Sequence, residues 1–474
     1  MSIKNLGKQS LIYGFGHVIT RLITFLLLPL YTNQFSPDQY GVVALFYTFV
    51  PLLNIIMRYG MGAAFLKHYV PANIEERIGI MTNVIVSLFI TGVPFLALFY
   101  LFREGLSQVL FSIVEPSYVV MMGLIIFLDT IWSIPMLAFR AENRPRIFIT
   151  LSFLNVGITL VCNIIFILVL NKGIESIFLS NLLASLSIFI LVIPYIMQRF
   201  QISYLVFSKW KNIFDFALPF LPAGLFAMIM EVADRYILNL LTDLETVGIY
   251  NAGYKVGVLM LLLVNAFNMG WQPYFLEKGF NPKSLIYSRI NSIVLAVLGF
   301  VWLNLLFWSD DLIKSEIFGL SFFGPKFFDS LSIIPWVGLS YFFYGFYLLQ
   351  TPGIFLKNRP SIAAWTRLFG AIANISLCFV LIPKFGAIGA AYATCISFAI
   401  MAFLMCFINM YLISFKLEII NIIVVVSLLS ISYCFFVIFN DSHFVNLAIM
   451  FFYIIIIFYF KIINIKNLNN LFAK

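Results

Sequence analysis

Apolar runs as long as a membrane span recur from one end of this sequence to the other. The first, at 11–32, is long enough to cross a bilayer as an α-helix that rises about 1.5 Å per residue. Only 10% of the 474 residues are charged and 62% are hydrophobic, whereas a soluble domain carries roughly 25% charged residues. So few charges cannot cover a globule with a water-facing surface, and we therefore predict an all-α integral membrane protein.

Fourteen such segments can be delimited along the chain, and we predict that each is a transmembrane helix. The connections are short, and the longest outer loop, near 308–330, is too small for an independent soluble domain. The segments lie near 11–32, 40–61, 80–102, 118–139, 147–170, 177–197, 216–241, 247–274, 290–307, 331–350, 362–382, 388–410, 419–439 and 444–460.

Lysine and arginine are distributed unequally between the two sides of the predicted membrane. If both termini are cytoplasmic, the inner loops carry 21 of the 29 lysines and arginines and the outer loops carry 5. This bias marks the cytoplasmic side, and it persists to the C-terminus, where a miscounted helix would have reversed it. We therefore predict fourteen spans with both termini cytoplasmic. The net charge of +9 then follows from topology, and a nucleic-acid partner is not expected.

Motifs for a metal, a disulfide framework or a nucleotide are missing from the sequence. The five cysteines all lie in apolar segments without a C-x-x-C pair, and the three histidines are far apart. No G-x-x-x-x-G-K-[ST] loop occurs, so ATP is not expected to drive the protein directly. We predict no disulfide, no metal site, no cofactor and no enzymatic activity.

Two halves of the chain match each other in sequence. At an offset of 207 residues, Gly41 aligns with Gly248, and each glycine follows a short acidic loop and opens the second helix of its half. The tripeptide Asn-Arg-Pro at 143–145 recurs at 358–360, where the fifth and the eleventh helices begin. The matches occur in the same order in both halves, which favours two copies of one unit over chance similarity between apolar segments.

Each copy contains six spans and begins on the cytoplasmic side. The copies are therefore parallel repeats, related by an axis along the membrane normal. We predict two six-helix lobes, 1–206 and 207–413, around a central cavity, with an additional helix pair at 414–474. Rocking of the lobes would expose the cavity to alternate sides, so this architecture points to a transporter and argues against a polymerase.

Ionisable side chains inside spans are costly, and those present usually face a cavity or a charged partner. Arg21, midway along the first helix, has no evident partner in its own helix, so we expect it to line the cavity. Arg58 and Arg367 lie near cytoplasmic ends, where the side chain is expected to snorkel to the membrane surface.

The seventh helix carries Glu231, Asp234 and Arg235 at i, i+3 and i+4. Lys255 lies in the eighth helix and Asp129 midway along the fourth. Two interpretations remain open. In the first, Glu231 or Asp234 neutralises Arg235 or Lys255 in a structural pair. In the second, these groups line the cavity. The three acids are also candidates for coupling transport to H⁺ or Na⁺. Cationic groups in an apolar cavity suit an amphiphilic anion, such as a diphosphate with a hydrocarbon tail.

Five short motifs are more specific than the composition. The seventh helix carries FALPFLPAG at 216–224 and DRY at 234–236, and the eighth opens with VGIY at 247–250. FSPDQYG occurs at 35–41, in the first outer loop, and IPKFGAIGAA at 382–391, between the eleventh and twelfth helices. Together these motifs resemble those of the polysaccharide-exporter family of bacterial flippases. The resemblance runs over most of the chain, and the family's span count matches.

The resemblance implies the two-lobed fold shared with multidrug and toxic-compound extrusion transporters and the lipid II flippase. It implies a flippase that carries an undecaprenyl-diphosphate-linked oligosaccharide repeat unit to the outer face of the bacterial plasma membrane, for O-antigen or capsule. The diphosphate or acidic sugars would meet Arg21, Arg235 and Lys255. A monomer is the default for a two-lobed carrier, and its expected partners are membrane lipids and polysaccharide assembly proteins. An ion gradient or consumption of the product outside would drive it.

Two alternative functions stay open. An ion-coupled drug or cation extruder of the same fold would use acidic cavity residues, for which Asp129 and Glu231 are available. An integral-membrane polysaccharide polymerase would need catalytic carboxylates at a membrane surface. Asp310 and Asp311, at the outer end of the ninth helix, are the only feature that points this way. The five motifs favour the flippase.

Overall fold

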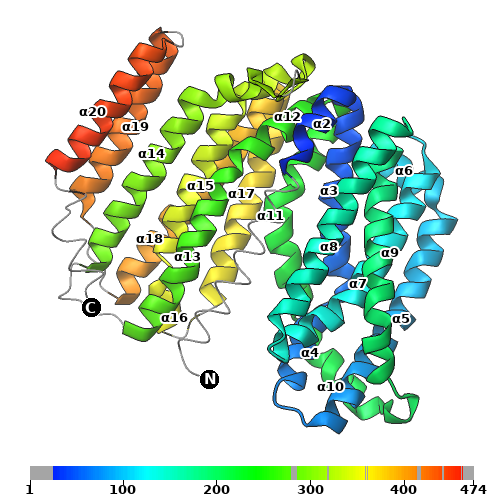
Figure 1. The fold of residues 1–474 in the computed structure, drawn as a ribbon. Helices are drawn as coiled ribbons and strands as arrows, with labels where there is room; N and C mark the ends of the chain where they lie inside the picture. The colour runs from blue at the N-terminus through cyan, green and yellow to red at the C-terminus, as the bar shows by residue number, and fades with distance from the viewer. Residues whose placement is uncertain are drawn as a thin grey trace. The chain divides into compact units, whose positions relative to one another are not determined.

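The computed structural model describes residues 25–278, 286–317, 320–357, 359, 361–413, 418–439, 442–460 and 462. Over these residues the chain is almost entirely α-helical, which confirms the predicted fold class (Figure 1). Within them β1 (Glu316–Ile317) and β2 (Leu320–Ser321) form one small antiparallel hairpin. The helical elements up to the middle of the chain are α2 (Leu27–Gln34), α3 (Pro37–Arg58), α4 (Met61–Tyr69), α5 (Ile74–Leu101), α6 (Arg103–Phe111), α7 (Pro116–Ala141), α8 (Pro145–Ile164), the π-helical turn η1 (Ile165–Val169), α9 (Glu175–Gln198), η2 (Ile202–Tyr204), α10 (Phe207–Ala217) and α11 (Phe220–Leu241). Those that follow are α12 (Leu244–Gly257), α13 (Leu259–Lys278), α14 (Ile286–Lys314), η3 (Pro325–Ser332), α15 (Ile334–Leu349), α16 (Pro352–Leu356), α17 (Ser361–Phe385), α18 (Ala387–Ile413), α19 (Ile419–Phe439) and α20 (His443–Tyr459).

The chain folds as two compact units, Met1–Gly248 and Ile249–Lys474, here called the first unit and the second unit. The boundary falls inside α12. As a result α10 and α11, which belong to the second sequence copy, pack within the first unit, α10 against α4 and α5 and α11 against α3. Packing and sequence repetition are different criteria, so the division into lobes at 206/207 and 413/414 stays a prediction.

α7 is the central helix of the first unit. It packs against α3, α5 and α9, and 72% of its most apolar window is buried, against 17% for the window that runs through α8 and η1. α8 therefore lies at the rim, packed mainly on α9. Phe65, Met81, Ile131 and Ile134 are fully buried and form an apolar core between α4, α5 and α7.

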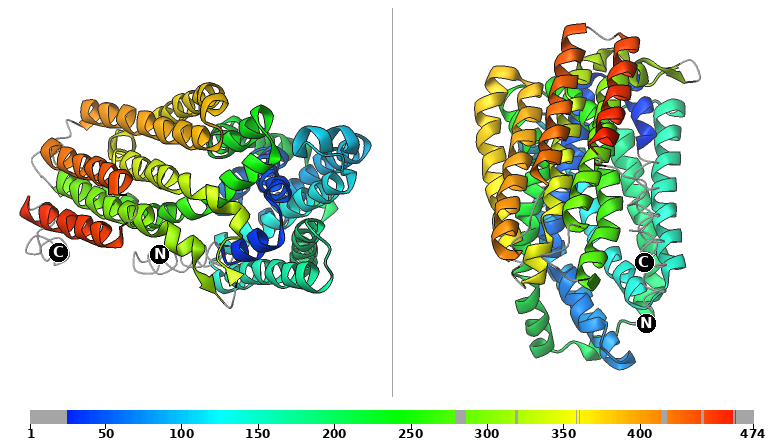
Figure 2. Two further views of the ribbon diagram at one scale, coloured as in Figure 1. Left: turned by 90° about the horizontal axis from the view of Figure 1, so that it is seen from above. Right: turned by 90° about the vertical axis from the view of Figure 1, so that its left-hand side faces the viewer.

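α15 has the corresponding place in the second unit, where it packs against α13, α14 and α18. The last two helices, α19 and α20, pack on each other and on α14 (Figure 2). Only 17% of the apolar window of α19 is buried, and Ile420 and Ile438 are each 71% exposed. So many exposed apolar side chains would be costly in water, and they fit a helix that faces lipid.

Ten helices of the described residues are long and apolar enough to cross a membrane, or twelve if each of two bent pairs is one span. One bent pair covers the predicted seventh span, where the segments Trp210–Phe226 and Met228–Leu241 meet at 46°. α20 has 17 residues, and most of the first predicted span, 11–32, lies outside the described residues. The count of fourteen therefore stays a prediction.

Three short helices, α4, α6 and α10, occupy positions that were expected to be mainly loop. α4 follows Gly60, whose φ of +82° is in the left-handed region and whose Cα lies too close to the carbonyl of Ala217 for a Cβ. α5 then begins with a capping box, in which Asn73 and Glu76 each accept the other's backbone N–H at 2.9 Å. Helices of 9 to 11 residues are too short to stand out as long apolar runs, which is why the sequence did not reveal them.

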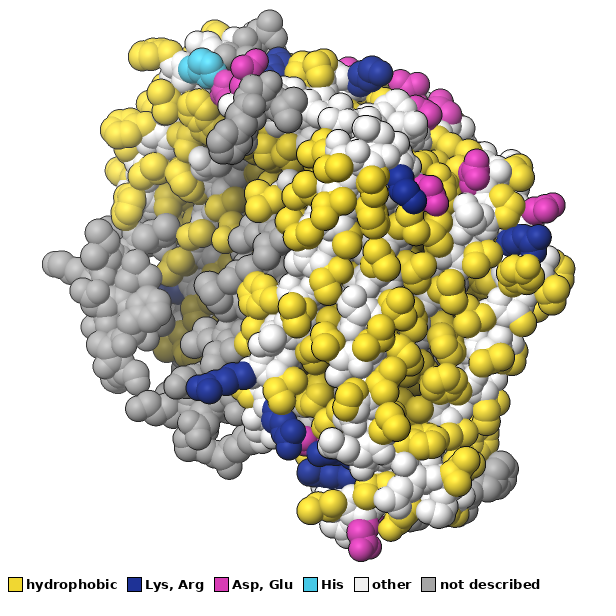
Figure 3. All heavy atoms as spheres, turned by 45° about the vertical axis from the view of Figure 1, so that its right-hand side comes forward, with side chains coloured by type: hydrophobic (Ala, Val, Ile, Leu, Met, Phe, Trp, Pro, Cys, Tyr) yellow, Lys and Arg dark blue, Asp and Glu magenta, His cyan; other side chains and the backbone are white. Residues whose placement is uncertain are grey.

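The distribution of charge over the surface fits a membrane protein. Figure 3 shows a face whose middle is covered by hydrophobic side chains, while Lys, Arg, Asp and Glu gather toward two opposite margins. The middle of such a surface contacts hydrocarbon, and its margins contact lipid headgroups and water. The protein is a multi-pass membrane protein.

Candidate functional site

Asp129, midway along α7, is held by groups from two helices. Its Oδ1 accepts hydrogen bonds from Trp132 Nε1 at 2.9 Å and from Ser185 Oγ of α9 at 2.5 Å. The neighbouring Thr130 hydroxyl donates to Asn54 Oδ1 of α3 at 3.4 Å. Neutral donors position a carboxylate without cancelling its charge, so Asp129 lies at the junction of α3, α7 and α9 as an ordered acid.

Arg58 of α3 points into the first unit and brings a positive charge near Asp129. Its Nη2 donates to the backbone carbonyl oxygen of Asp129 at 3.4 Å, and its Nε is buried without a hydrogen-bond partner in the described part of the chain. The expectation that Arg58 snorkels to the membrane surface is therefore wrong. The reason is that α4 begins only three residues after Arg58, so Arg58 does not lie at a free helix end.

α11 carries a compact ion pair. Arg235 Nη1 lies 2.9 Å from Asp234 Oδ1 and donates to the backbone carbonyl oxygen of Glu231 at 2.7 Å. Asp234 and Arg235 are 2% and 7% exposed, whereas Glu231 is exposed. The structure thus brings Asp234 and Arg235 together as direct neighbours, while Glu231 contributes a main-chain group. Each charge of the pair is balanced by the other, which offsets part of the desolvation cost of burying both.

The other predicted site residues have different environments. Lys255 is half-buried on α12, in the part of that helix that belongs to the second unit. Arg21 lies outside the described residues. Among the six candidates, the structure therefore joins Glu231, Asp234 and Arg235, and it places Asp129 in a separate cluster with Arg58.

The two glycines matched by the internal repeat pack closely where α3 meets the start of α12. A Cβ on Gly41 would overlap the carbonyl oxygen of Leu244, and a Cβ on Gly248 would overlap that of Pro37. Leu244 follows Pro37 by the same 207 residues that separate Gly248 from Gly41, so the two contacts are reciprocal. A local two-fold axis produces reciprocity of this kind, which links the sequence repeat to the packing.

Glu142, directly after α7, is a hub that the sequence analysis missed. Its Oε1 accepts hydrogen bonds from the hydroxyls of Tyr69 and Tyr195, each at 2.8 Å. Arg199 Nη2 lies 3.3 Å from Oε1, and Arg144 Nε lies 3.2 Å from Oε2. Burial raises the pKa of Glu142, but the two tyrosine hydrogen bonds and the two arginine charges together outweigh it and hold the pKa below its ordinary value. The ionised carboxylate thus ties α4, α7 and α9 together at one end of the first unit.

Three buried amide side chains form a neutral chain of polar links in the core of the second unit. Gln350 Nε2 donates to Asn291 Oδ1 at 2.6 Å, and Asn409 Nδ2 donates to Gln350 Oε1 at 3.3 Å. Asn409 Oδ1 accepts the backbone N–H of Gly353 at 2.8 Å. The three amide residues are 0% exposed. This chain of amides joins α14, α18 and the end of α15 without placing a charge in the core.

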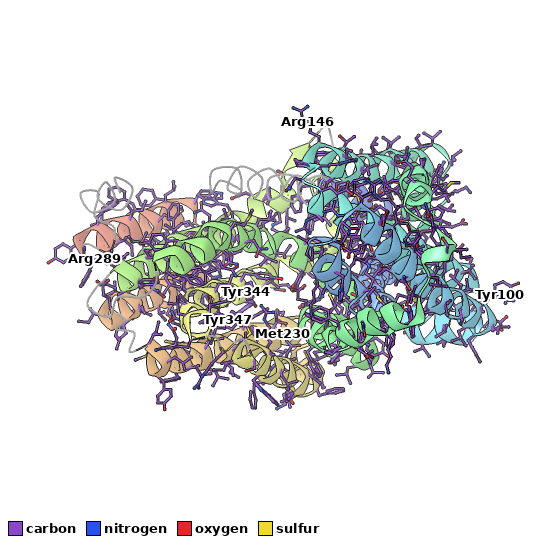
Figure 4. All side chains as sticks on the ribbon, turned by 90° about the horizontal axis from the view of Figure 1, so that it is seen from below. Tyr100, Arg146, Met230, Arg289, Tyr344 and Tyr347 are labelled. Carbon is purple, nitrogen blue, oxygen red and sulfur yellow. The ribbon has the colours of Figure 1, made fainter. Side chains whose placement is uncertain are left out.

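Two tyrosines on α15 form a further polar feature of the second unit. Tyr344 and Tyr347 stack with ring centroids 6.0 Å apart and planes at 14° (Figure 4). Tyr347 is 1% exposed, and its hydroxyl has no hydrogen-bond partner among the residues that the structure describes. A buried hydroxyl without a partner costs about 1–3 kcal/mol. Such a group calls for an explanation, and contact with a bound substrate is one.

Asp310 and Asp311, the two acids that pointed to a polymerase, face different partners. Asp310 Oδ1 lies 2.7 Å from Lys314 Nζ, whereas Asp311 Oδ2 lies 3.7 Å from Nδ1 of His443 on α20. Two carboxylates that act on one bond must converge on it. Their arrangement therefore gives no support to a shared catalytic site.

Solved structures share this fold. The lipid II flippase MurJ, in an inward closed conformation, matches 96% of this chain and 100% of its own length, with a TM-score of 0.74 at 16% identity. An inward-facing multidrug resistance MATE family transporter matches 83% of this chain and 94% of its own length, with a TM-score of 0.67 at 13% identity. The class is therefore a multi-pass helical membrane protein with the fold seen in MurJ and in this MATE family transporter.

Sequence comparison gives the family. An uncharacterized membrane protein of Methanocaldococcus jannaschii is 24% identical over 419 residues, which cover 80% of this chain and 79% of that protein. One from Haemophilus influenzae is 22% identical over 430 residues, 82% of this chain and 91% of that protein. The model of the family described as "Polysaccharide biosynthesis protein" matches residues 6–278. That match covers more than half of the chain, so the chain belongs to this family. The match confirms the resemblance seen in the motifs.

Proposed function

We propose that the protein is a flippase for an undecaprenyl-diphosphate-linked oligosaccharide repeat unit, which it moves from the cytoplasmic to the outer face of a bacterial plasma membrane. The product would enter a surface polysaccharide such as O-antigen or capsule. One observation carries the proposal: a member of the polysaccharide biosynthesis family has, over 96% of its length, the fold of a protein that flips lipid II. The partners are then the lipid-linked oligosaccharide, membrane lipids and polysaccharide assembly proteins, and the protein acts as a monomer without a cofactor.

The proposed cycle is alternating access between two lobes, 1–206 and 207–413, with 414–474 as an accessory helix pair and both termini in the cytoplasm. The reciprocal contacts of Gly41 and Gly248 support the repeat on which this division rests. Arg21, Arg235 and Lys255 would bind the diphosphate or acidic sugars. The Arg235 charge is already balanced by Asp234 at 2.9 Å, so a diphosphate would compete with that carboxylate and shift the pair as it binds.

Asp129, Glu231 and Asp234 are proposed to couple the cycle to H⁺ or Na⁺, or else to balance the cationic groups. Glu231 has the exposure that a proton or cation needs to reach it. Asp129 has the half-buried Arg58 nearby, whose approach or withdrawal would change the affinity of the carboxylate for a proton. Neutralising Glu231 and Asp129 separately would tell a coupling group, whose loss abolishes dependence on the ion gradient, from a purely structural one.

The deciding experiment is deletion of the gene in its host, followed by analysis of surface polysaccharide and of lipid-linked intermediates on each face of the membrane. The proposal expects lost surface glycan, with complete repeat units accumulating on their lipid carrier at the cytoplasmic face. Complementation with Arg21→Ala and with the wild-type gene then tests Arg21, because loss of a substrate contact should spare folded yield and abolish transport.

The same experiment separates the alternatives. If the protein were a polymerase, deletion of its gene would leave single repeat units on the outer face, because they would be flipped but not joined. The MATE-like fold keeps a drug or cation extruder as the second candidate, and that function predicts unchanged glycan with increased sensitivity to cationic drugs. Unchanged glycan in a host without a redundant exporter would overturn the flippase.

A further inference from the structure

A pocket of about 300 Å³ opens at one end of the second unit, where α14 and α19 end and α15 and α18 begin. The positive-inside bias predicts that this end is the outer one. Residues from all four helices line the pocket, and those that carry the argument are Asp310, Trp336, Tyr392 and Tyr433. The volume is at the lower end of the range of about 300–1,000 Å³ for small-molecule sites.

Three aromatic rings form walls of this pocket. The Trp336 ring meets Tyr392 edge-on, with centroids 4.6 Å apart and planes at 84°, and it meets Tyr433 at 5.5 Å and 69°. The three rings are half-buried, whereas their lipid-facing neighbours on α19, Phe435 and Ile438, are 44% and 71% exposed. Interfacial aromatic residues commonly face lipid headgroups. Trp336, Tyr392 and Tyr433 instead line a pocket within the protein.

The polar side of the pocket is a carboxylate whose charge is already balanced. Asp310 Oδ1 and Oδ2 lie 2.7 and 3.0 Å from Lys314 Nζ, and the Asp310 side chain keeps 33% exposure. An ionised carboxylate has about four lone-pair sites, so Asp310 can still accept hydrogen bonds from hydroxyl groups. Because Lys314 cancels the charge, a cationic ligand gains little here, and a neutral ligand with hydroxyl groups is favoured.

We infer that this pocket binds a pyranose ring of a glycan. A sugar ring has an apolar C–H face, which stacks on an aromatic ring, and a rim of hydroxyl groups, which donate to a carboxylate. Trp336 supplies the aromatic face, Tyr392 and Tyr433 bound it, and Asp310 accepts hydroxyl hydrogen bonds. The pocket is too small for a whole repeat unit, so it holds one sugar after the glycan has reached the outer face. The presence of a glycan there rests on the proposed function, whereas the binding itself does not.

The test is saturation-transfer NMR on the purified full chain in nanodiscs. The probes are glucose, galactose, mannose, N-acetylglucosamine, N-acetylgalactosamine, rhamnose and glucuronate, together with an acid hydrolysate of the host's surface polysaccharide. Choline serves as the cationic probe, because aromatic rings with a carboxylate also suit a quaternary ammonium group. The expected result is transfer to the C–H protons of one ring face of at least one sugar, and none to choline.

Matched variants assign the signal to the pocket. Trp336→Ala and Asp310→Asn should each lower the sugar affinity about tenfold, since stacking and a charge-assisted hydrogen bond each contribute on that scale. Trp308→Ala and Asp311→Asn are the controls: Trp308 stacks on His443 at 5.7 Å, Asp311 pairs with the same histidine, and both lie outside the pocket lining. Both controls should bind sugar as the wild type does.

Every outcome decides the inference. No transfer to any sugar, transfer to choline alone, or sugar binding that Trp336→Ala leaves unchanged would each overturn it. Failure of the subsite is distinct from failure of the flippase. Lost surface glycan on gene deletion with no sugar binding retains the flippase and removes the subsite. Sugar binding that depends on Trp336, with unchanged surface glycan on deletion, retains the subsite and removes the flippase.

Discussion

The interior helices of the first unit and those of the second unit are linked by different kinds of polar group. In the first unit, Arg58 lies against Asp129, and Asp234 pairs with Arg235 in the interior. In the second, Asn291, Gln350 and Asn409 link the central helices through neutral amides. Amides tie helices together without the desolvation cost of buried charge. Charges are therefore not needed to hold such a helical unit together, which is consistent with the binding or coupling role that we propose for those of the first unit.

The largest loss of stability is expected when one charge of the α11 pair is removed. Asp234→Ala leaves the Arg235 guanidinium without its nearest carboxylate and should cost about 3–5 kcal/mol of stability, seen as a lower melting temperature and a lower folded yield in detergent. Asp310→Ala is the control, because its pair with Lys314 is largely exposed and should cost less than about 1 kcal/mol. Equal losses in both variants would contradict the buried-pair interpretation.

A double variant can give the first unit the neutral polar groups of the second. In the double variant Asp234→Asn with Arg235→Gln, the ion pair becomes an amide pair, and stability should change by about 1 kcal/mol or less, since a replaced buried pair is often neutral in energy. Transport of the lipid-linked glycan, measured by complementation of the deletion strain, should fall severely. Full complementation by this variant would mean that the charges serve only the structure.

A loss of stability smaller than that of Asp234→Ala is expected where the repeat copies meet. Gly248→Ala places a Cβ against the carbonyl of Pro37, and the displacement that follows should cost about 1–3 kcal/mol. Gly157→Ala is the matched control, because nothing lies within 4 Å of its Cβ position, and it should be neutral or slightly stabilising. Thermal melts of the two purified variants compare the sites, and an unchanged melt for Gly248→Ala would disprove the close crossing.

Disruption of the amide chain of the second unit should lower the stability of the protein without impairing transport. Gln350→Leu leaves Asn291 Oδ1 and Asn409 Nδ2 without these partners, which should destabilise the protein by about 2 kcal/mol. The transport rate per folded molecule should stay near that of the wild type. A specific loss of transport at normal stability would give the amides the role that we assign to the charges.

The smallest effect is pH-dependent and belongs to Glu142. Its pKa is lowered in the folded state, so its stabilising contribution is complete above the pKa of the unfolded chain and is lost as the pH falls through the lower, folded value. The wild type should therefore melt at a lower temperature in acid than at neutral pH. Glu142→Gln should reduce that difference, and an identical pH profile for the two proteins would argue against the hub.

Most helix positions could be predicted, but their polar partners could not. The predicted spans 419–439 and 118–139 correspond to α19 and to the interior of α7, because an apolar run and its caps are local properties. The polar sequence AENRPR at 141–146 was the only local sign of the Glu142 hub. Its partner Tyr69 lies 73 positions away, in the short helix α4 that the sequence did not reveal.

The amino-acid sequence was enough to predict the membrane class, the family and the charged pair Asp234 and Arg235 inside a span, because a bilayer leaves the backbone few ways to satisfy its hydrogen bonds and charges are rare inside it. Which of these groups meet became clear from the packing of the helices: Arg58 lies beside Asp129, and Trp336 contacts Tyr392 and Tyr433. Each helix carries several side chains that could form such contacts. The rotation of each helix about its axis and its position along its neighbours select which of these side chains meet, and no single segment of sequence encodes either.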